Sequence, residues 1–448
     1  MELDHIYIDE NLKLDAISMF DVDSLLNFDC THAHQDTATG LEKNGDDNEL
    51  CSEVDCGVSE FMETVLVEET RHLKENIQEE FMDESSLTDM LLTAAEAIEA
   101  EDWLLSLTMI ERLKSRLTDR QNGKNSFLKL GFFFTQGLQY KSFNAPELPH
   151  ILPVQKQTNT MSSFQMLQEL TPYVKFAHLA ANQAILETTQ GDPEVHVIDF
   201  DVMEGIQWPP LMIDLVSRKG ASLRITAVVG ESRSIGHTQQ TGRRLKEFAD
   251  SIYLPFRFEQ IMLENEDDYE RIDASNKLIA NCMIHQLHKP CRNFASVKCF
   301  LNGVRKLSPK MIILTEEEIL NFINIPSMSF VDFFCEAFHH YTALYESLVT
   351  SFRGYKAGLK LIEEVIELRI LDSLKQFPFG SSDKKSWEDG FSSLKGYKAI
   401  PMSYHNISQA KYLVGLFSGG YWVQYEKCKL HLCWKSRPLV STTVWVPL

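Results

Sequence analysis

From residue 195 to residue 315, short apolar runs of strand length alternate with stretches whose apolar residues repeat at helical spacing. The runs are rich in Val, Ile, Leu and Phe, which is typical of strands buried on both faces. Alternation of this kind predicts a mostly parallel sheet covered by helices on both sides. The strands are expected over residues 195–200, 223–229, 255–261, 277–284 and 311–315, with helices over residues 174–188, 241–252 and 331–352.

The end of the chain has a different pattern. Two apolar and aromatic runs, residues 420–425 and 430–435, are separated by four residues, which predicts an antiparallel β-hairpin. A parallel sheet that finishes in such a hairpin is the layout of S-adenosylmethionine-dependent methyltransferases, a likeness of fold that implies no activity by itself. The sequence therefore predicts an α/β, Rossmann-like, methyltransferase-like fold.

Before residue 174 the periodicity is helical. Ser86 is placed to cap a helix with one apolar face, and a second such helix follows. Two helices of this kind form either a cap on the core or a face that docks a partner. Their apolar residues are the candidate partner-binding set: Leu87, Leu91, Ala95, Ile98, Leu107 and Ile110.

Charge divides the chain into two parts. Residues 1–85 contain 24 Asp and Glu but four Lys and Arg, whereas the rest of the 448 residues is close to neutral. A segment this acidic and this poor in aromatic residues cannot bury enough apolar surface to offset the conformational entropy that it would lose on ordering. We therefore expect a disordered arm. Within it, residues 15–28 interleave acids with bulky apolar residues, as an activation segment or a solvated linker would. The acidic arm and the near-neutral remainder both disfavour independent DNA binding.

Residues 195–208 are the most informative segment. They read as a buried strand that ends in carboxylates, then a loop with a single glycine, then a helix that begins near Pro209. This order usually places a ligand crevice at the carboxyl end of the strand. A dinucleotide loop needs two or three glycines, however, and Gly205 stands alone. Asp199 and Asp201 are therefore candidates for ribose binding or catalysis, or for capping and loop hydrogen bonds.

One cluster has the side chains of a metal site. Cys282, His285, His288 and Cys291 recur every three residues, and all four are zinc-ligand types. Their spacing does not fit the usual zinc frames, and a strand would place Cys282 and His285 on opposite faces. We therefore predict no metal, no cofactor and no catalytic residue. The nine cysteines without a Cys-x-x-Cys pair indicate a reduced intracellular protein, and no apolar run is long enough for a membrane span.

Aromatic residues gather near the end of the chain and include Trp434 and Trp445. Interleaved aromatic side chains can stack on nucleic acid, but the neighbouring positive charge is sparse. We expect these rings to pack the hairpin against the sheet.

Together these segments resemble the motifs of plant GRAS-domain regulatory proteins. Residues 195–208 are similar to the family's Val-His-Ile-Ile-Asp motif, residues 92–98 to its first leucine-rich region, and residues 336–348 to its long helix. Residues 201–208 and 434–439 look most like the nodulation-signalling pathway 2 subgroup. Thr443-Val444-Trp445 stands where the family ends in Ser-Ala-Trp. The matched positions that we expect to be structural are Val195, His196, Ile198, Asp199, Gly205, Gln207, Trp208, Arg224, Trp434 and Trp445.

The resemblance implies a GRAS domain over residues 86–448, with a helical cap over about 86–190 and an α/β core over about 191–448. It further implies a non-enzymatic transcriptional co-regulator of the plant nucleus that dimerises with GRAS proteins, docks transcription factors and reaches DNA through a partner. The subgroup implies a place in symbiotic or strigolactone-related signalling. Two alternatives stay open: a small-molecule-binding or S-adenosylmethionine-dependent methyltransferase-like protein, and a direct sequence-specific DNA-binding transcription factor.

Overall fold

The computed structural model describes residues 84–118, 125–142, 160–229, 235–262, 266–272, 277–284, 294–323, 328–377, 394, 396–417 and 419–448. All of them belong to one compact unit, Glu80–Leu448. The predicted acidic arm therefore lies almost wholly outside the described residues, and its disorder stays a prediction.

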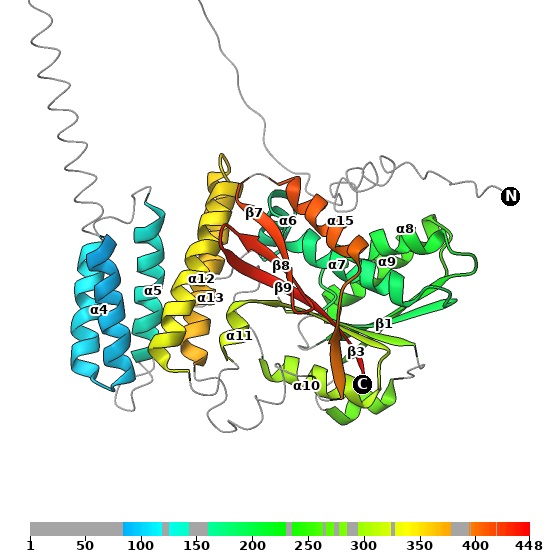
Figure 1. Ribbon diagram of the computed structural model, residues 1–448, viewed down its shortest axis with the longest axis horizontal. Helices are drawn as coiled ribbons and strands as arrows, with labels where there is room; N and C mark the ends of the chain where they lie inside the picture. The colour runs from blue at the N-terminus through cyan, green and yellow to red at the C-terminus, as the bar shows by residue number, and fades with distance from the viewer. Residues whose placement is uncertain are drawn as a thin grey trace, which may run out of the picture. The chain divides into compact units, whose positions relative to one another are not determined.

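The strands of the described residues form one sheet of nine, which lies at the centre of this unit (Figure 1). Five parallel strands lie in the order β3-β2-β1-β4-β5, so the chain starts in the middle and winds out both ways. They are β1 (Glu194–Phe200), β2 (Ser222–Val229), β3 (Phe256–Met262), β4 (Leu278–Met283) and β5 (Met311–Glu317). Each falls within one or two residues of a predicted strand. The interior strands β1, β2, β4 and β5 are buried almost throughout, as their continuous apolar runs predicted.

The sheet continues beyond β5 with antiparallel strands. β9 (Arg437–Pro447) pairs with β5, then β8 (Lys429–Trp434) and β7 (Tyr421–Glu426) follow, and β6 (Tyr397–Ile400) pairs with the far part of β9. The β7–β8 hairpin is as predicted, whereas β9 and β6 were not predicted. β9 carries the polar run Ser441-Thr442-Thr443, which is buried and hides the strand pattern. The hydroxyls of Thr442 and Thr315, 2.9 Å apart, satisfy part of it.

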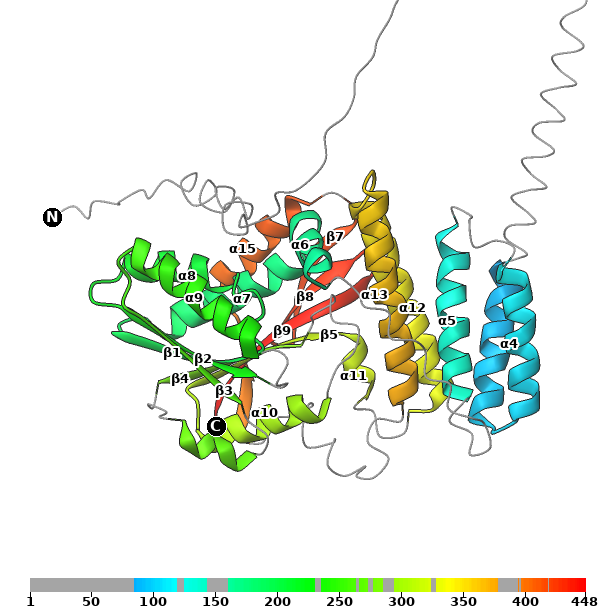
Figure 2. The same cartoon turned by 180° about the vertical axis from the view of Figure 1, so that it is seen from behind.

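Helices cover both faces of the sheet. α7 (Tyr173–Thr188), α8 (Trp208–Val216), α9 (Ile235–Ser251) and α15 (Tyr404–Gly415) lie on one face, and α10 (Phe294–Lys306) lies on the other, as both views show (Figures 1 and 2). Pro209 stands in the first turn of α8, where the missing N–H removes no helical bond. The fold is thus the methyltransferase-like α/β arrangement that the sequence predicts.

A second group of helices packs beside the sheet. A helix over residues 84–99 precedes α4 (Trp103–Thr118) and α5 (Ser126–Ser142), and α5 packs against α12 (Phe330–Ser351) and α13 (Lys356–Gln376). Phe134 of α5 makes edge-on ring contacts with Phe334 and Phe338 of α12. This helical region is therefore built from two stretches that are far apart in the sequence, residues 84–142 and residues 330–376.

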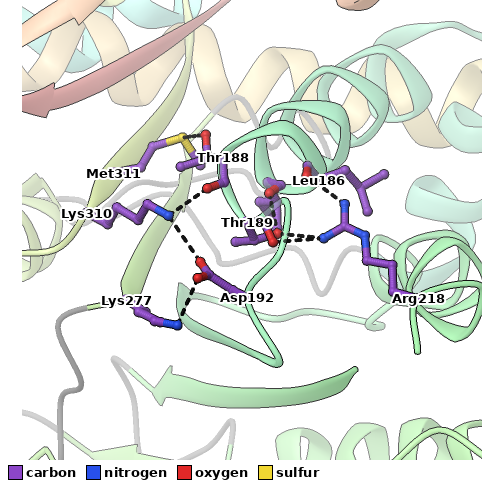
Figure 3. A network of polar contacts seen from close by, with 9 residues as sticks. Leu186, Thr188, Thr189, Asp192, Arg218, Lys277, Lys310 and Met311 are labelled. Atoms are coloured by element: carbon purple, nitrogen blue, oxygen red, sulfur yellow. Dashed lines mark hydrogen bonds and ion pairs between the residues drawn. The ribbon is translucent and has the colours of Figure 1, made fainter. Parts of the chain in front are cut away.

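Cationic side chains hold the end of α7 at the amino ends of the strands (Figure 3). Arg218 donates to the carbonyl oxygens of Leu186 and Thr189 at 2.6 and 3.1 Å, and Lys310 donates to that of Thr188 at 2.7 Å. Lys310 also pairs with Asp192. Cationic donors at a helix C-terminus satisfy its last carbonyl groups and interact favourably with the negative end of the helix dipole. Because Lys310 directly precedes β5, its hydrogen bond fixes this end of α7 to β5.

Candidate functional site

The loop that follows β1 has an unusual backbone. Asp201, Met203 and Gly205 adopt φ values of 70°, 51° and 75°, and two of these three are not glycines. The left-handed region costs a residue with a side chain about 1 kcal/mol or more. The surrounding structure must therefore hold this loop in place.

Gly205 lets the loop approach the protein's own helix. A Cβ atom built on Gly205 would lie 2.7 Å from Cγ2 of Thr241 and 3.1 Å from Cδ1 of Leu245, both on α9. In a dinucleotide loop the glycine lets backbone approach a ligand. Here the same freedom is used for packing against α9, which supports the structural interpretation of this residue.

The loop carboxylate nearest to this contact is already paired. Glu204 receives His237 Nε2 at 2.9 Å and Arg244 Nη2 at 3.0 Å, both from α9. These contacts keep the pKa of Glu204 below its usual range despite the opposing effect of burial, and the contact with Glu204 raises the pKa of His237. Thr241 adds a hydrogen bond of 2.9 Å to the carbonyl oxygen of Met203. The loop is thus fastened to α9 on both sides of Glu204.

A buried polar network joins the other side of the loop to the sheet. Asn281 of β4 donates to Oδ1 of Asp199 at 2.8 Å and to Oε1 of Gln207 at 3.0 Å. Gln207 in turn donates to Oδ1 of Asn182 on α7 at 3.2 Å, and Asn182 donates to the carbonyl oxygen of Gln207 at 2.7 Å. The network fixes the loop against β1, β4 and α7 together.

Burial changes the acidity of the central carboxyl group. Asp199 is 2 % exposed, and loss of hydration raises its pKa to about 7, although the side chains of Asn281 and Trp208 oppose the rise. A buried carboxyl group with a raised pKa in a crevice is also what a catalytic acid looks like. Here the amide of Asn281 occupies one of its oxygens, so the arrangement has a sufficient structural explanation.

The crevice itself is small. Its walls come from α7, the loop and the end of β4, and include Tyr173, His178, Asp199, Gln207 and Met283. The space open to the centre of a water molecule is about 30 Å³, enough for about two waters.

The other motif residues contribute to the core or to pairs across the sheet. Val195, Ile198 and Trp208 are fully buried. His196 meets Thr226 of β2 at 2.9 Å, and Arg224 pairs with Glu259 of β3 at 2.8 Å. Trp434 is buried and donates to Glu346 of α12 at 3.0 Å, whereas the partly buried Trp445 donates to Thr443 at 2.9 Å.

The candidate partner-binding residues lie largely inside the fold. Five of the six are at most 5 % exposed, and Leu107 is half-buried. The apolar face of the helix over residues 84–99 is therefore buried by contacts within the unit. The exposed apolar residues of this region are Leu104 and Leu105 of α4, at 80 % and 41 %. They were missed because they stand between the regularly spaced apolar positions that identified the helix.

The Cys/His cluster is described only at its first member. Cys282 is buried in β4, and burial raises its thiol pKa well above the usual range, which disfavours the thiolate form. His285, His288 and Cys291 lie outside the described residues. Among the residues that are described, no cluster of three or more ligand-type side chains could hold a metal ion, and no helix is long and apolar enough to cross a membrane.

The sequence motifs did not reveal what holds the loop. None of the four residues His237, Arg244, Asn182 and Asn281 was predicted as a site residue. They are ordinary polar residues on three elements, α9, α7 and β4, and their convergence follows from the strand order rather than from any spacing in the chain.

Fold and site together define a methyltransferase-like α/β protein in which the loop after β1 packs inward. Residues 87–446 match the GRAS domain family, and the chain belongs to this family. It is 35 % identical to Protein NODULATION SIGNALING PATHWAY 2 of Medicago truncatula and 33 % identical to that of Lotus japonicus, each match covering 80 % of this chain and 75 % of the relative. The crystal structure of SCL7 from Oryza sativa aligns with a TM-score of 0.63 at 25 % identity, covering 80 % of this chain and 99 % of that one. The chain is a plant GRAS regulator with relatives in signalling pathways.

Proposed function

We propose that the protein is a nuclear, non-enzymatic transcriptional co-regulator that dimerises with other GRAS proteins and docks transcription factors, in symbiotic or strigolactone-related signalling. The relatives named NODULATION SIGNALING PATHWAY 2 support the choice of pathway. The non-enzymatic part rests on one observation, the inward packing of the loop after β1.

The inward packing of the loop engages the glycine and the carboxylates that a ligand at this edge of the sheet would contact. Gly205 faces α9, Glu204 is paired with His237 and Arg244, and Asp199 is bonded to Asn281. A ligand bound to these groups would have to displace those contacts. These three residues therefore support a structural role for the loop, in which it positions the helices around it. We propose that partners bind on the outer surface of the protein.

Contact with DNA is proposed to go through a partner. The part of the sequence after residue 85 is close to neutral, and affinity for DNA depends on neutralising phosphates with Lys and Arg. A gel-shift series across salt concentrations tests this point. Steeply salt-dependent, sequence-selective binding by the protein alone would favour the direct DNA-binding alternative.

For dimerisation, the surface of α4 is the better candidate than the buried apolar set. Leu104 and Leu105 expose apolar area, while Leu91 and Ile98 support the fold. The double variant Leu104→Asp/Leu105→Asp should keep its melting temperature and lose association with GRAS proteins about tenfold or more, as expected for apolar anchor residues. Co-precipitation from plant nuclei, with mass spectrometric identification of GRAS proteins and transcription factors, measures the effect.

Two matched variants make the result interpretable. Val216→Asp places the same charge on an apolar residue of α8 that is 44 % exposed, and should leave association unchanged. Leu91→Ala removes a buried side chain and should cost about 2–5 kcal/mol of stability. Recovery of neither GRAS proteins nor transcription factors with the wild-type chain would contradict the function, and undiminished recovery with the double variant would contradict the α4 surface.

A further inference from the structure

One side of the central sheet ends in β3. Among the strands that the structure describes, β3 pairs with β2 alone. In both ribbon views the parallel strands lie at the opposite end of the unit from α4 (Figures 1 and 2). An open strand edge offers its N–H and C=O groups to a further strand. The outer edge of β3 is therefore a candidate interaction surface that is separate from α4.

This outer edge presents an uninterrupted ladder of backbone groups. The N–H of Leu223 in β2 donates to the carbonyl oxygen of Pro255 at 3.0 Å, so the backbone of Pro255 faces β2. Backbone groups of successive strand residues point to opposite sides, and those of Phe256, Phe258 and Gln260 therefore point outward. The N–H that proline lacks would lie on the β2 side, so Pro255 does not interrupt the outer ladder.

Charged side chains beside this ladder restrict what can pair with it. Arg257 and Glu259 lie on the same face of β3, and Glu259 forms ion pairs with Arg257 and with Arg224 of β2. The side chain of Arg257 is 66 % exposed, so it can reach across the edge. Side chains that stand directly opposite in an antiparallel pair interact strongly, and like charges there are destabilising. A fitting strand therefore presents an acid to Arg257 and a base to Glu259.

We propose that this edge binds β3 of a second copy of the chain, antiparallel to it, across a twofold axis at Phe258. Arg257 then stands opposite Glu259 of the second copy, and Glu259 stands opposite its Arg257. A shift of two residues either way would set Arg257 against Arg257 or Glu259 against Glu259. The outward groups of Phe258 pair with each other, and those of Phe256 pair with those of Gln260. Charge and hydrogen bonding therefore select the same register.

Exposed apolar side chains at the two ends of β3 meet in the same arrangement. Tyr253, which lies just before the strand, is 93 % exposed, and Met262 at its end is 43 % exposed. Antiparallel pairing brings the start of one strand beside the end of the other, so Tyr253 lies next to Met262 of the second copy. Contacts between a thioether and an aromatic ring are favourable. The proposal goes beyond the function above and does not depend on it, because it does not involve α4.

Sedimentation velocity of the full chain over a dilution series tests the proposal, and the wild type is expected to associate reversibly into dimers. Arg257→Glu sets acids opposite each other across the twofold axis, and Glu259→Arg sets arginines opposite each other. Each variant should weaken self-association about tenfold or more. An equal mixture of the two variants should form dimers again, because every acid then stands opposite an arginine.

Further variants separate the backbone ladder from the charges. Gln260→Pro removes an outward N–H and should also weaken self-association about tenfold or more, whereas the single chain tolerates proline where an edge strand faces solvent. Gln260→Ala keeps that N–H and should behave as the wild type does. Leu104→Asp/Leu105→Asp should leave self-association unchanged. Melting temperatures check that each variant is folded.

Several results would overturn the proposal. A wild type that stays monomeric throughout the series is one, and an Arg257→Glu variant that dimerises as well as the wild type is another. A mixture of folded Arg257→Glu and Glu259→Arg chains that forms no dimers would exclude the register. Dimers that are lost in Leu104→Asp/Leu105→Asp but kept in Arg257→Glu would place the contact between copies on α4 instead of β3.

Discussion

At the scale of one residue, Gly205 lies in the loop that often binds a ligand in α/β folds, but here it packs against α9. Its φ of 75° is matched by that of Gly220, 74°, so the two glycines have the same backbone requirement. They differ in their surroundings, because a Cβ on Gly205 meets α9 while nothing lies within 4 Å of one on Gly220. A comparison of the same substitution at Gly205 and Gly220 therefore separates the free-energy cost of backbone strain from the cost of overpacking.

We expect Gly205→Ala to lower the free energy of unfolding more than Gly220→Ala does. Both variants incur about 1 kcal/mol for the left-handed backbone. Only the first also forces a methyl group into Thr241 and Leu245, for which overpacking adds about 1–3 kcal/mol. Urea denaturation of both variants measures the difference. Equal losses would show that the loop does not press on α9.

Asp199 gives a prediction about pH. Its pKa of about 7 in the folded chain lies above the value near 4 that an unfolded aspartate has. The folded state then binds the extra proton between these values, so this group lowers stability as pH rises from about 4 to 7, by at most about 1.4 kcal/mol per pH unit.

Asp199→Asn should remove that contribution. Relative to wild type, its free energy of unfolding should rise between pH 5 and pH 7.5, and urea denaturation at the two values measures this. Asp201→Asn makes the same chemical change at a half-buried loop position and serves as the control. Parallel pH curves for Asp199→Asn and wild type would contradict the assigned burial of the charge.

At the scale of the element, the loop and α9 act as one piece. Glu204 joins them through His237 and Arg244, and Thr241 adds its bond to Met203. Charge on Glu204 raises the pKa of His237, so the histidine reports whether the two elements are in contact.

Glu204→Gln should therefore lower the pKa of His237 toward its ordinary value near 6.5. Nuclear magnetic resonance titration of histidine side chains in the full chain measures the shift, and His405, exposed on α15, provides an internal reference. A His237 pKa that stays raised in the variant would exclude Glu204 as its cause.

Elements also show what sequence can and cannot predict. The interior strands were predicted because they are buried on both faces and read as unbroken apolar runs. β9 was missed because its buried Ser441, Thr442 and Thr443 look like a loop until β5 supplies a partner. The packing of α12 and α13 beside α5 was missed too, since periodicity identifies a helix and its face but not its neighbour.

At the scale of the whole molecule, the acidic arm and the near-neutral folded unit differ sharply in charge. Family motifs identified the fold and the loop, because those residues are contiguous. The network of Asn182, Asp199, Gln207 and Asn281 could not be predicted from spacing, because three elements bring it together. It lines a crevice at the carboxyl ends of the parallel strands, where open α/β sheets usually bind their ligands.

We propose that this methyltransferase-like fold uses the carboxyl ends of its parallel strands, the usual ligand position in open α/β sheets, for internal packing. Calorimetric titration of the purified full chain with S-adenosylmethionine tests it most directly. We predict no saturable heat, for the wild type and for Asp199→Asn alike. A stoichiometric micromolar signal in the wild type that Asp199→Asn abolishes would contradict it.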